Sequence, residues 1–206
     1  MTLEAQAEFE VRLSRARPYN RPQYLRVKAI ALREHGGNDH RRAARDLNER
    51  LIRDYPDSFP DLVVAHEQLA LLAQEDGLPE QAIRHYRDAL YLSVEGAPTG
   101  DAILRLPELL IGEQSNPERL REAATILGRI DVDRDLAFSS QRFRYNALRA
   151  RLAEQDGDPT SAAAFANAAL AEWHRSTPDF RRHATLGWVQ STPETLAQLA
   201  RLAASD

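Results

Sequence analysis

Two histidines and an aspartate in one short segment are the first candidates for chemistry in this sequence. His35 and His40 flank the segment 36–39, which reads Gly-Gly-Asn-Asp. Imidazole and carboxylate groups bind transition metals, but this spacing matches no established zinc pattern. The alternative is that the two glycines end one helix while Asn38 or Asp39 caps the next. We favour this second interpretation and predict no metal site here.

An acidic motif, Asp131-Val-Asp133-Arg-Asp135, superficially resembles a calcium-binding loop. The sixth and twelfth positions of such a loop need glycine and glutamate, whereas this sequence has Leu136 and Arg142 there. We therefore predict that Asp135 caps the helix that follows. Four further histidines are dispersed over different expected helices, and we assign none of them a ligating or catalytic role: His66, His85, His174 and His183.

Enzyme signatures are missing from the sequence. It contains no glycine-rich phosphate loop, no hydrolase nucleophile elbow and no His-Glu-x-x-His zinc motif. It also has no cysteine, which excludes disulfides, thiolate zinc sites and cysteine nucleophiles. We therefore predict a non-enzymatic protein without catalytic residues, metal or cofactor. A metal-dependent enzyme on a helical scaffold is the less favoured alternative.

Composition indicates a globular protein. Of 206 residues, 43% are apolar and 28% are charged. No run of about 20 apolar residues predicts a membrane helix, and the start lacks the layout of a secretion signal, so we expect a cytoplasmic protein. The 27 basic residues include a single lysine, Lys28, as codon bias in a GC-rich, bacterial-like genome would produce. The net charge of −4 disfavours general nucleic-acid binding.

Helical periodicity runs through almost the whole chain, without the alternating pattern of strands. Proline recurs where helices would begin, and glycine follows where they would end. Pro107 falls inside one expected helix and should kink or split it. These signals predict helices over 3–16, 22–35, 40–54, 60–75, 79–95, 101–112, 117–128, 136–155, 159–175, 178–187 and 193–204.

An internal repeat is the strongest single signal. Residues 72–82 read LAQEDGLPEQA, and residues 152–162 read LAEQDGDPTSA. Each copy indicates a helix, a glycine turn and a second helix opened by proline. In the first copy Ala82 and Ala89 are seven residues apart and share a helix face, where small side chains permit close packing. The second copy repeats this alanine pair.

This pattern resembles the tetratricopeptide repeat, a helix-turn-helix of about 34 residues that stacks into a right-handed superhelix. The copies at 62–95 and 142–175 are clear, whereas those at 24–58 and 101–135 are degenerate, and none has the family's usual tryptophan. The resemblance implies an all-α, right-handed solenoid forming a single domain over 1–206. A generic helical bundle is the alternative.

The two terminal helices, 3–16 and 193–204, lie outside the repeats. The second carries an apolar stripe of Leu196, Leu199 and Leu202. We expect such helices to cap the exposed ends of the stack. The alternative is that they dock a second copy of the protein and form a homodimer.

The resemblance also implies a binding surface, because in this family the first helix of each repeat lines a concave groove that contacts a peptide or a partner helix. Carried over by repeat position, the groove residues are Arg26, Ala29, Arg33, Val64, Glu67, Leu71, Arg105, Arg144, Ala147 and Arg151. Inward arginines would favour an acidic or phosphate-bearing ligand. The alternative is that they pair with acids such as Glu67 on the adjacent helix or face solvent.

These observations together predict a non-catalytic adaptor or scaffold that binds an unidentified protein or peptide, with a preference for an acidic one. A helical repeat that binds nucleic acid through the same arginines is the main alternative, which the net negative charge disfavours. We expect no membrane association.

Overall fold

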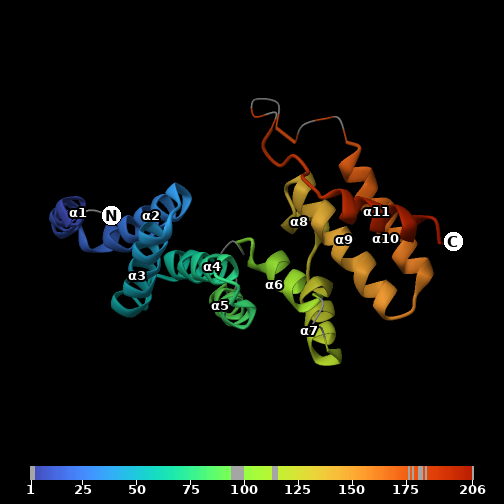
Figure 1. Cartoon of the computed structure of the whole chain (residues 1–206), viewed down its shortest axis with the longest axis horizontal. Coiled ribbons are helices and arrows are strands. Elements are labelled where there is room, and N and C mark those ends of the chain that lie inside the picture. The colour runs from blue at the N-terminus through green and yellow to red at the C-terminus, as the bar shows by residue number, and fades with distance from the viewer. Residues whose placement is uncertain are drawn as a thin grey trace. The chain divides into compact units, whose positions relative to one another are not determined.

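The computed structural model describes residues 3–93, 100–112, 116–175, 177, 179–180, 183 and 185–205. Within these ranges the chain consists of helices, turns and loops without a strand, which confirms the all-α prediction (Figure 1). The described helices are α1 (Leu3–Arg15), α2 (Arg21–His35), α3 (Asn38–Asp54), α4 (Phe59–Glu75), α5 (Pro79–Leu92), α6 (Ala102–Leu110), α7 (Pro117–Gly128), α8 (Val132–Asp135), α9 (Ser139–Gln155), α10 (Pro159–Trp173) and α11 (Pro193–Ala203), with a 3-10 turn η1 (Pro18–Asn20) before α2.

Proline and short polar side chains set most helix starts. Proline occupies the first or second position of α2, α4, α5, α7, α10 and α11. Its missing N–H costs nothing there, since the first turn has no intrahelical acceptor. Asn116, Asp158 and Thr192 cap α7, α10 and α11 by accepting hydrogen bonds from backbone N–H groups of the first turn. Pro107 lies inside α6, as expected, but does not split it, since α6 continues to Leu110.

Two expected caps are wrong. Asn38 and Asp39 are the first two residues of α3, whose N-cap is Gly37, and the Asn38 side chain accepts a hydrogen bond from Arg41 instead of from a backbone N–H. Asp135 ends the short helix α8 and accepts a hydrogen bond from the backbone N–H of Asp131 at 2.9 Å. The helix expected over 136–155 therefore begins three residues later, at Ser139.

The helix expected over 178–187 is also wrong for the residues that the structure describes there, which form bends and a turn. Gly187 has a φ of +79°, and a Cβ at this position would lie 2.6 Å from the ring of Phe138. Its carbonyl accepts a hydrogen bond from the Ser140 N–H at 2.9 Å. This turn therefore lies against the start of α9, where helical geometry would break the contact.

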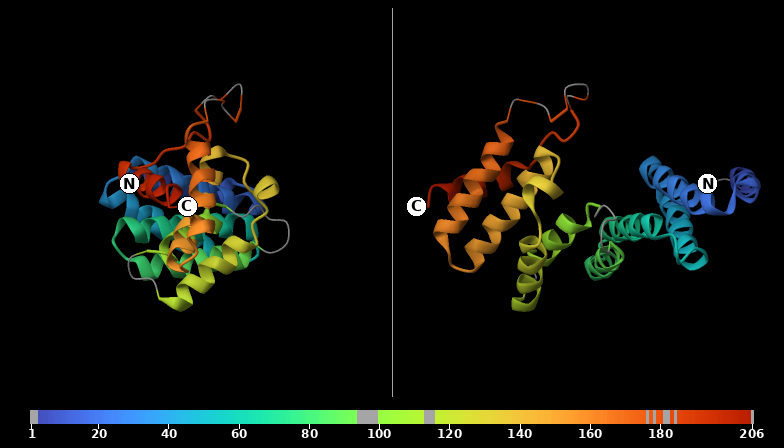
Figure 2. Two further views of the ribbon diagram at one scale, coloured as in Figure 1. Left: turned by 90° about the vertical axis from the view of Figure 1, so that its right-hand side faces the viewer. Right: turned by 180° about the vertical axis from the view of Figure 1, so that it is seen from behind.

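The described helices fall into two compact units, unit 1 (Met1–Ala102) and unit 2 (Ile103–Asp206). In unit 1, α2 packs against α3, α4 against α5, and α2 also contacts α4. In unit 2, α9 packs against α10 and contacts α7, and α11 packs against α10 and α9. Figure 2 shows α9 and α10 side by side with α11 across them. The sequence predicted a single domain, whereas each of these units has a core of its own.

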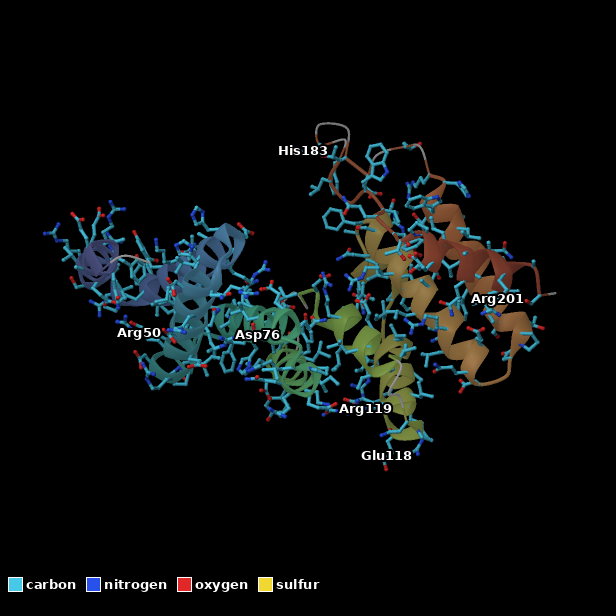
Figure 3. All side chains as sticks on the ribbon, in the orientation of Figure 1. Arg50, Asp76, Glu118, Arg119, His183 and Arg201 are labelled. Carbon is cyan, nitrogen blue, oxygen red and sulfur yellow. The ribbon has the colours of Figure 1, made fainter. Side chains whose placement is uncertain are left out.

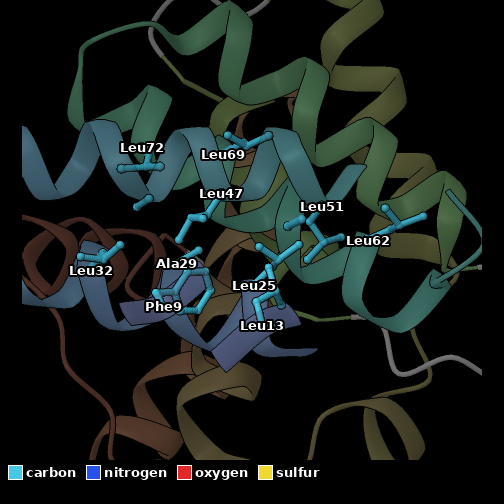
Figure 4. Close-up of a cluster of buried hydrophobic side chains, with 12 residues drawn as sticks. Phe9, Leu13, Leu25, Ala29, Leu32, Leu47, Leu51, Leu62, Leu69 and Leu72 are labelled. Carbon is cyan, nitrogen blue, oxygen red and sulfur yellow. The ribbon is translucent and has the colours of Figure 1, made fainter. Parts of the chain in front are cut away.

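The core of unit 1 is built from leucine and alanine side chains of α1 to α4 (Figure 4). Leu25, Leu51 and Leu72 are fully buried there. Burial of each such side chain contributes about 1.5–3 kcal/mol. In unit 2, alanines take much of the interface between α9 and α10, including Ala150, Ala162, Ala166 and Ala169. Small side chains let these two helices approach closely.

Both terminal helices pack on their own units. Phe9 and Leu13 of α1 are buried in the core of unit 1, and Leu199 and Leu202 of α11 are buried in the core of unit 2. The apolar face of α11 is therefore covered within its own unit. No described helix is long and apolar enough to cross a membrane.

Ion pairs reinforce this packing at the surface. The Arg50 guanidinium of α3 donates to both carboxylate oxygens of Glu10 in α1, at 2.5 and 3.2 Å. Arg201 of α11 donates to Glu154 of α9 at 2.6 Å. Arg50 and Arg201 are labelled in Figure 3. Because these side chains are partly solvated, we expect each pair to contribute less than the apolar contacts beneath it.

Candidate functional site

Two of the predicted groove arginines, Arg26 and Arg33 of α2, bind side chains of α4. The Arg26 Nε donates to Asp61 Oδ1 at 2.7 Å, and the Arg33 Nε donates to Gln68 Oε1 at 2.7 Å. Arg33 also donates to Glu75 Oε1 at 3.1 Å. The first two bonds both span 35 residues and join α2 to α4. These arginines therefore link α2 to α4.

Unit 2 uses its inward arginines in the same way. Arg144 of α9 donates to Glu108 Oε2 of α6 at 2.9 Å, 36 residues earlier. Arg151 donates to the backbone carbonyl of Ile111 at 3.0 Å. Arg105, on α6, is half-buried. The sequence left open whether these arginines bind a ligand or pair with acids of the protein itself. Arg144, like Arg26 and Arg33, pairs with an acidic side chain on another helix.

The remaining predicted groove residues differ in exposure. Ala29 has no exposed surface and lies in the core of unit 1, and Ala147 is buried in the core of unit 2, so their assignment to a ligand-contacting surface is wrong. Val64 and Leu71 of α4 are half-buried. The Glu67 carboxylate accepts a hydrogen bond from the Ala102 N–H at 2.9 Å, within unit 1.

Arg33 should make a measurable contribution to stability. Replacing it with alanine leaves the side-chain amide oxygen of the buried Gln68 without its guanidinium donor. This loss should lower the free energy of unfolding by about 1–3 kcal/mol. Urea denaturation followed by circular dichroism measures this change. Arg12→Ala is the control, because the Arg12–Glu8 pair is exposed and should contribute at most about 0.5 kcal/mol. Equal effects of the two substitutions would contradict a structural role for Arg33.

A groove between α1 and α2 forms a concave surface on unit 1, with a volume of about 610 Å³. Tyr24 and Val27 line it and remain 46% and 53% exposed. On the α1 side of the groove, Arg12 forms an ion pair with Glu8 of the same helix. Its other lining residues are Ala5, Phe9, Asn20, Gln23, Lys28 and Ala31.

Lys28, the single lysine of the chain, lies in this groove. It forms no ion pair or hydrogen bond with any residue in the part of the chain that the structure describes. Because Glu8 and Arg12 neutralise each other, the Lys28 ammonium is the uncompensated charge among the lining residues. The groove therefore combines exposed apolar side chains with one positive charge.

A cluster of His66, His85 and Asp88 is the candidate metal-ligating group within the described residues. His66 lies on α4, and the other two lie on α5. Their ligand atoms all lie within 4.8 Å of one another. The residues His35, Asp39 and His40 do not form such a group within the described part of the chain, and the imidazole rings of His35 and His40 are 4.7 Å apart.

Both clustered histidines favour the neutral form. Burial lowers the pKa of His66, and the negative charge of Asp88 opposes this shift. Burial also lowers the pKa of His85, helped by His66 and Arg84 and opposed by Asp88 and Glu49. A neutral imidazole has a lone pair available to a hydrogen-bond donor or a metal ion.

Sequence reasoning missed this cluster because it treated histidines on different helices as dispersed. A usable signal was present. His66 lies 11 residues before Gly77, the turn of the α4–α5 hairpin, and His85 and Asp88 lie 8 and 11 residues after it, so antiparallel packing brings His66 opposite this pair. Asp88 follows His85 by three residues and shares its helix face.

Unit 1 therefore has two candidate binding sites. The α1–α2 groove offers apolar contacts and one ammonium group, and the histidine cluster offers nitrogen and oxygen ligands for a metal ion. The inward arginines offer less, since their donors already have internal acceptors. The sequence matches no model of a known protein family and shows no significant similarity to any curated protein.

Proposed function

We propose that this protein is a non-catalytic protein–protein interaction module built from tetratricopeptide-like helix hairpins. Three hairpins of consecutive helices, α2–α3, α4–α5 and α9–α10, support this proposal. So do the bonds between α2 and α4 that recur at a spacing of 35 residues, close to the length of one such repeat. A right-handed solenoid is the arrangement in which repeats of this kind stack.

The α1–α2 groove carries the functional part of the proposal. Tyr24 and Val27 expose apolar surface in a concavity, which a partner's side chains would remove from water. The Lys28 ammonium would bind a carboxylate at the edge of the same contact. An amphipathic helix with apolar residues three and four positions apart and an acidic flank fits this chemistry.

In this proposal the predicted groove arginines join helices and do not contact the partner. A ligand acid or phosphate would have to displace Asp61 from Arg26 and Glu108 from Arg144. Such a displacement exchanges one charge-assisted bond for another and yields little net affinity. We therefore place the acidic partner in the α1–α2 groove instead of on these arginines, and nucleic-acid binding loses its proposed contacts.

Site-specific photocrosslinking tests the groove. The photoreactive residue p-benzoylphenylalanine is placed at position 24, and in a control protein at position 91, where Tyr91 is exposed on α5. After irradiation in an extract of the source cells, mass spectrometry identifies the crosslinked peptides. We expect position 24, but not position 91, to capture one segment that forms an amphipathic, acidic helix. Equal capture from both positions, or no capture from position 24, would contradict the proposal.

Substitution then measures the affinity for a synthetic peptide of the captured segment. Val27→Asp should weaken binding more than about 10-fold, because it puts a carboxylate among the apolar side chains that line the groove. Lys28→Glu should also weaken it, through loss of the charge complement. Tyr91→Asp is the matched control and should bind like the unaltered protein. Isothermal titration calorimetry gives the dissociation constants, and circular dichroism verifies the fold of each variant.

A further inference from the structure

We propose that His66, His85 and Asp88 form a binding site for a divalent transition-metal ion, preferably zinc. This site lies on α4 and α5 and is separate from the groove between α1 and α2. Two imidazole nitrogens and a carboxylate oxygen are a common zinc ligand set in proteins, with a water or an external ligand in the fourth position.

Two of the three distances between the ligand atoms fit a tetrahedral ion, and all three atoms lie within 4.8 Å of one another. Bonds of about 2.0–2.1 Å to zinc place neighbouring ligand atoms of a tetrahedron about 3.3–3.4 Å apart. His66 Nδ1 lies 3.3 Å from His85 Nδ1 and 3.5 Å from Asp88 Oδ2. Two edges of the coordination tetrahedron are therefore close to their final lengths before any ion binds.

The helix hairpin explains why these atoms converge. His66 is positioned by α4, while His85 and Asp88 are presented three residues apart by one face of α5. A ligand pair at positions i and i+3 on one helix, completed from a facing helix, is how helical bundles commonly hold metal ions. Close packing of α4 on α5 fixes the distance between the two helices.

Burial gives the site both rigidity and access. The His66 side chain is 13% exposed, so packing restricts its imidazole ring, whereas the Asp88 side chain is 56% exposed and opens the site to solvent. An ion can therefore enter past Asp88, and a water molecule can occupy the fourth position. A carboxylate on the open side also partly neutralises the positive charge of the ion.

The chemistry of the ligands selects the class of metal. Imidazole ligands favour zinc, copper and nickel, whereas calcium and magnesium prefer sites built from oxygen. We therefore expect zinc to bind and magnesium, at the same concentration, not to bind. The nearby Glu49 favours cation binding electrostatically, and Arg84 opposes it.

Zinc titration of the full chain, without an affinity tag and after chelator treatment, tests the site. Competition with a chromophoric chelator measures both stoichiometry and affinity. We expect one tight site per chain. His85→Gln should weaken it more than about 100-fold, since it removes a direct ligand and not merely a supporting contact. Asp88→Asn changes an exposed residue while keeping its shape, so it tests the site even if His85→Gln disturbs the fold.

A matched control uses the other histidine pair of unit 1. Replacing both His35 and His40 with glutamine removes two neighbouring imidazoles that lack a third ligand among the residues described. This variant should keep the tight site. Cobalt substitution adds a spectroscopic test, because tetrahedral cobalt absorbs visible light much more strongly than the hydrated ion does. Absence of a tight site, or its retention in both His85→Gln and Asp88→Asn, would overturn the proposal.

Discussion

Leu51→Ala should lower the free energy of unfolding of unit 1 by about 2–5 kcal/mol. Leu51 has no exposed surface and is packed among leucines of α2 and α4 (Figure 4). Its truncation removes apolar contacts and leaves a cavity that the rigid helices around it fill only in part. A loss of this size is a large fraction of the stability of a small folded unit.

The positions of the tryptophans allow this effect to be assigned to one unit. Trp173 and Trp188, the two tryptophans of the chain, both belong to unit 2, whereas Leu51 belongs to unit 1. Far-ultraviolet circular dichroism reports helices of both units, and tryptophan fluorescence reports unit 2. In urea, we expect Leu51→Ala to move the early part of the dichroism transition and to leave the fluorescence midpoint in place.

Leu78→Ala is the control for this prediction. Leu78 precedes α5 and is 48% exposed, so removing its side chain should change the stability by no more than about 0.5 kcal/mol. If Leu51→Ala shifts the fluorescence midpoint as far as the dichroism midpoint, the two units unfold together and the assignment to unit 1 is wrong.

The helices were predictable because their signals are local. The proline at the start of α5 and the glycine that follows α4 act within a few residues of the boundaries they set. The failure at 178–187 has the opposite cause. Asp179 and Gly187 contact Ser139 and Ser140 at the start of α9, 40 and 47 residues earlier in the sequence, and local helical periodicity contains no information about such contacts.

The predicted groove residues show the same difference between local signals and contacts that are distant in sequence. Repeat position correctly grouped Arg26 and Arg33 on one face of α2, since helical spacing alone fixes that face. It could not show that Asp61 and Gln68 had already satisfied their donors, because each bond spans 35 residues. Whether an inward arginine binds a ligand or a neighbouring helix depends on side-chain packing, which the sequence does not specify locally.

Asp179→Ala should lower the free energy of unfolding of unit 2 by about 3 kcal/mol. The Asp179 carboxylate is 7% exposed and accepts hydrogen bonds from the N–H and hydroxyl of Ser139, each at 2.8 Å, and from Arg142 Nη2 at 3.1 Å. It thus caps α9 from a distant segment and neutralises a guanidinium that is only 19% exposed. Its removal leaves the Ser139 N–H and hydroxyl without this acceptor and takes one of two carboxylate partners from Arg142, which keeps Glu172, and buried polar groups that lose their partners are costly.

The pH dependence of this loss follows from the pKa of Asp179. Burial alone would raise that pKa, but the hydrogen bonds from Ser139 and the charge of Arg142 outweigh it, so the folded pKa lies below the ordinary value of 3.8. A group whose folded pKa is lowered stabilises the fold above its unfolded pKa and loses this contribution as the pH falls through the folded value. The difference between the unaltered protein and Asp179→Ala should therefore be full at pH 7 and disappear progressively below about pH 4.

Asp158→Ala is the control that distinguishes the combined capping and ion pairing of Asp179 from simple helix capping. Asp158 caps α10 in the same unit by accepting a hydrogen bond from the Ser161 N–H at 3.0 Å, but it is exposed and pairs with no arginine among the described residues. Its removal should cost about 1 kcal/mol, as for a simple N-cap. Urea denaturation followed by tryptophan fluorescence measures both variants in unit 2. A loss for Asp179→Ala no larger than that for Asp158→Ala would mean that Arg142 is held by its other acceptors, Glu172, the Leu136 carbonyl and the Ser139 hydroxyl, and not by Asp179.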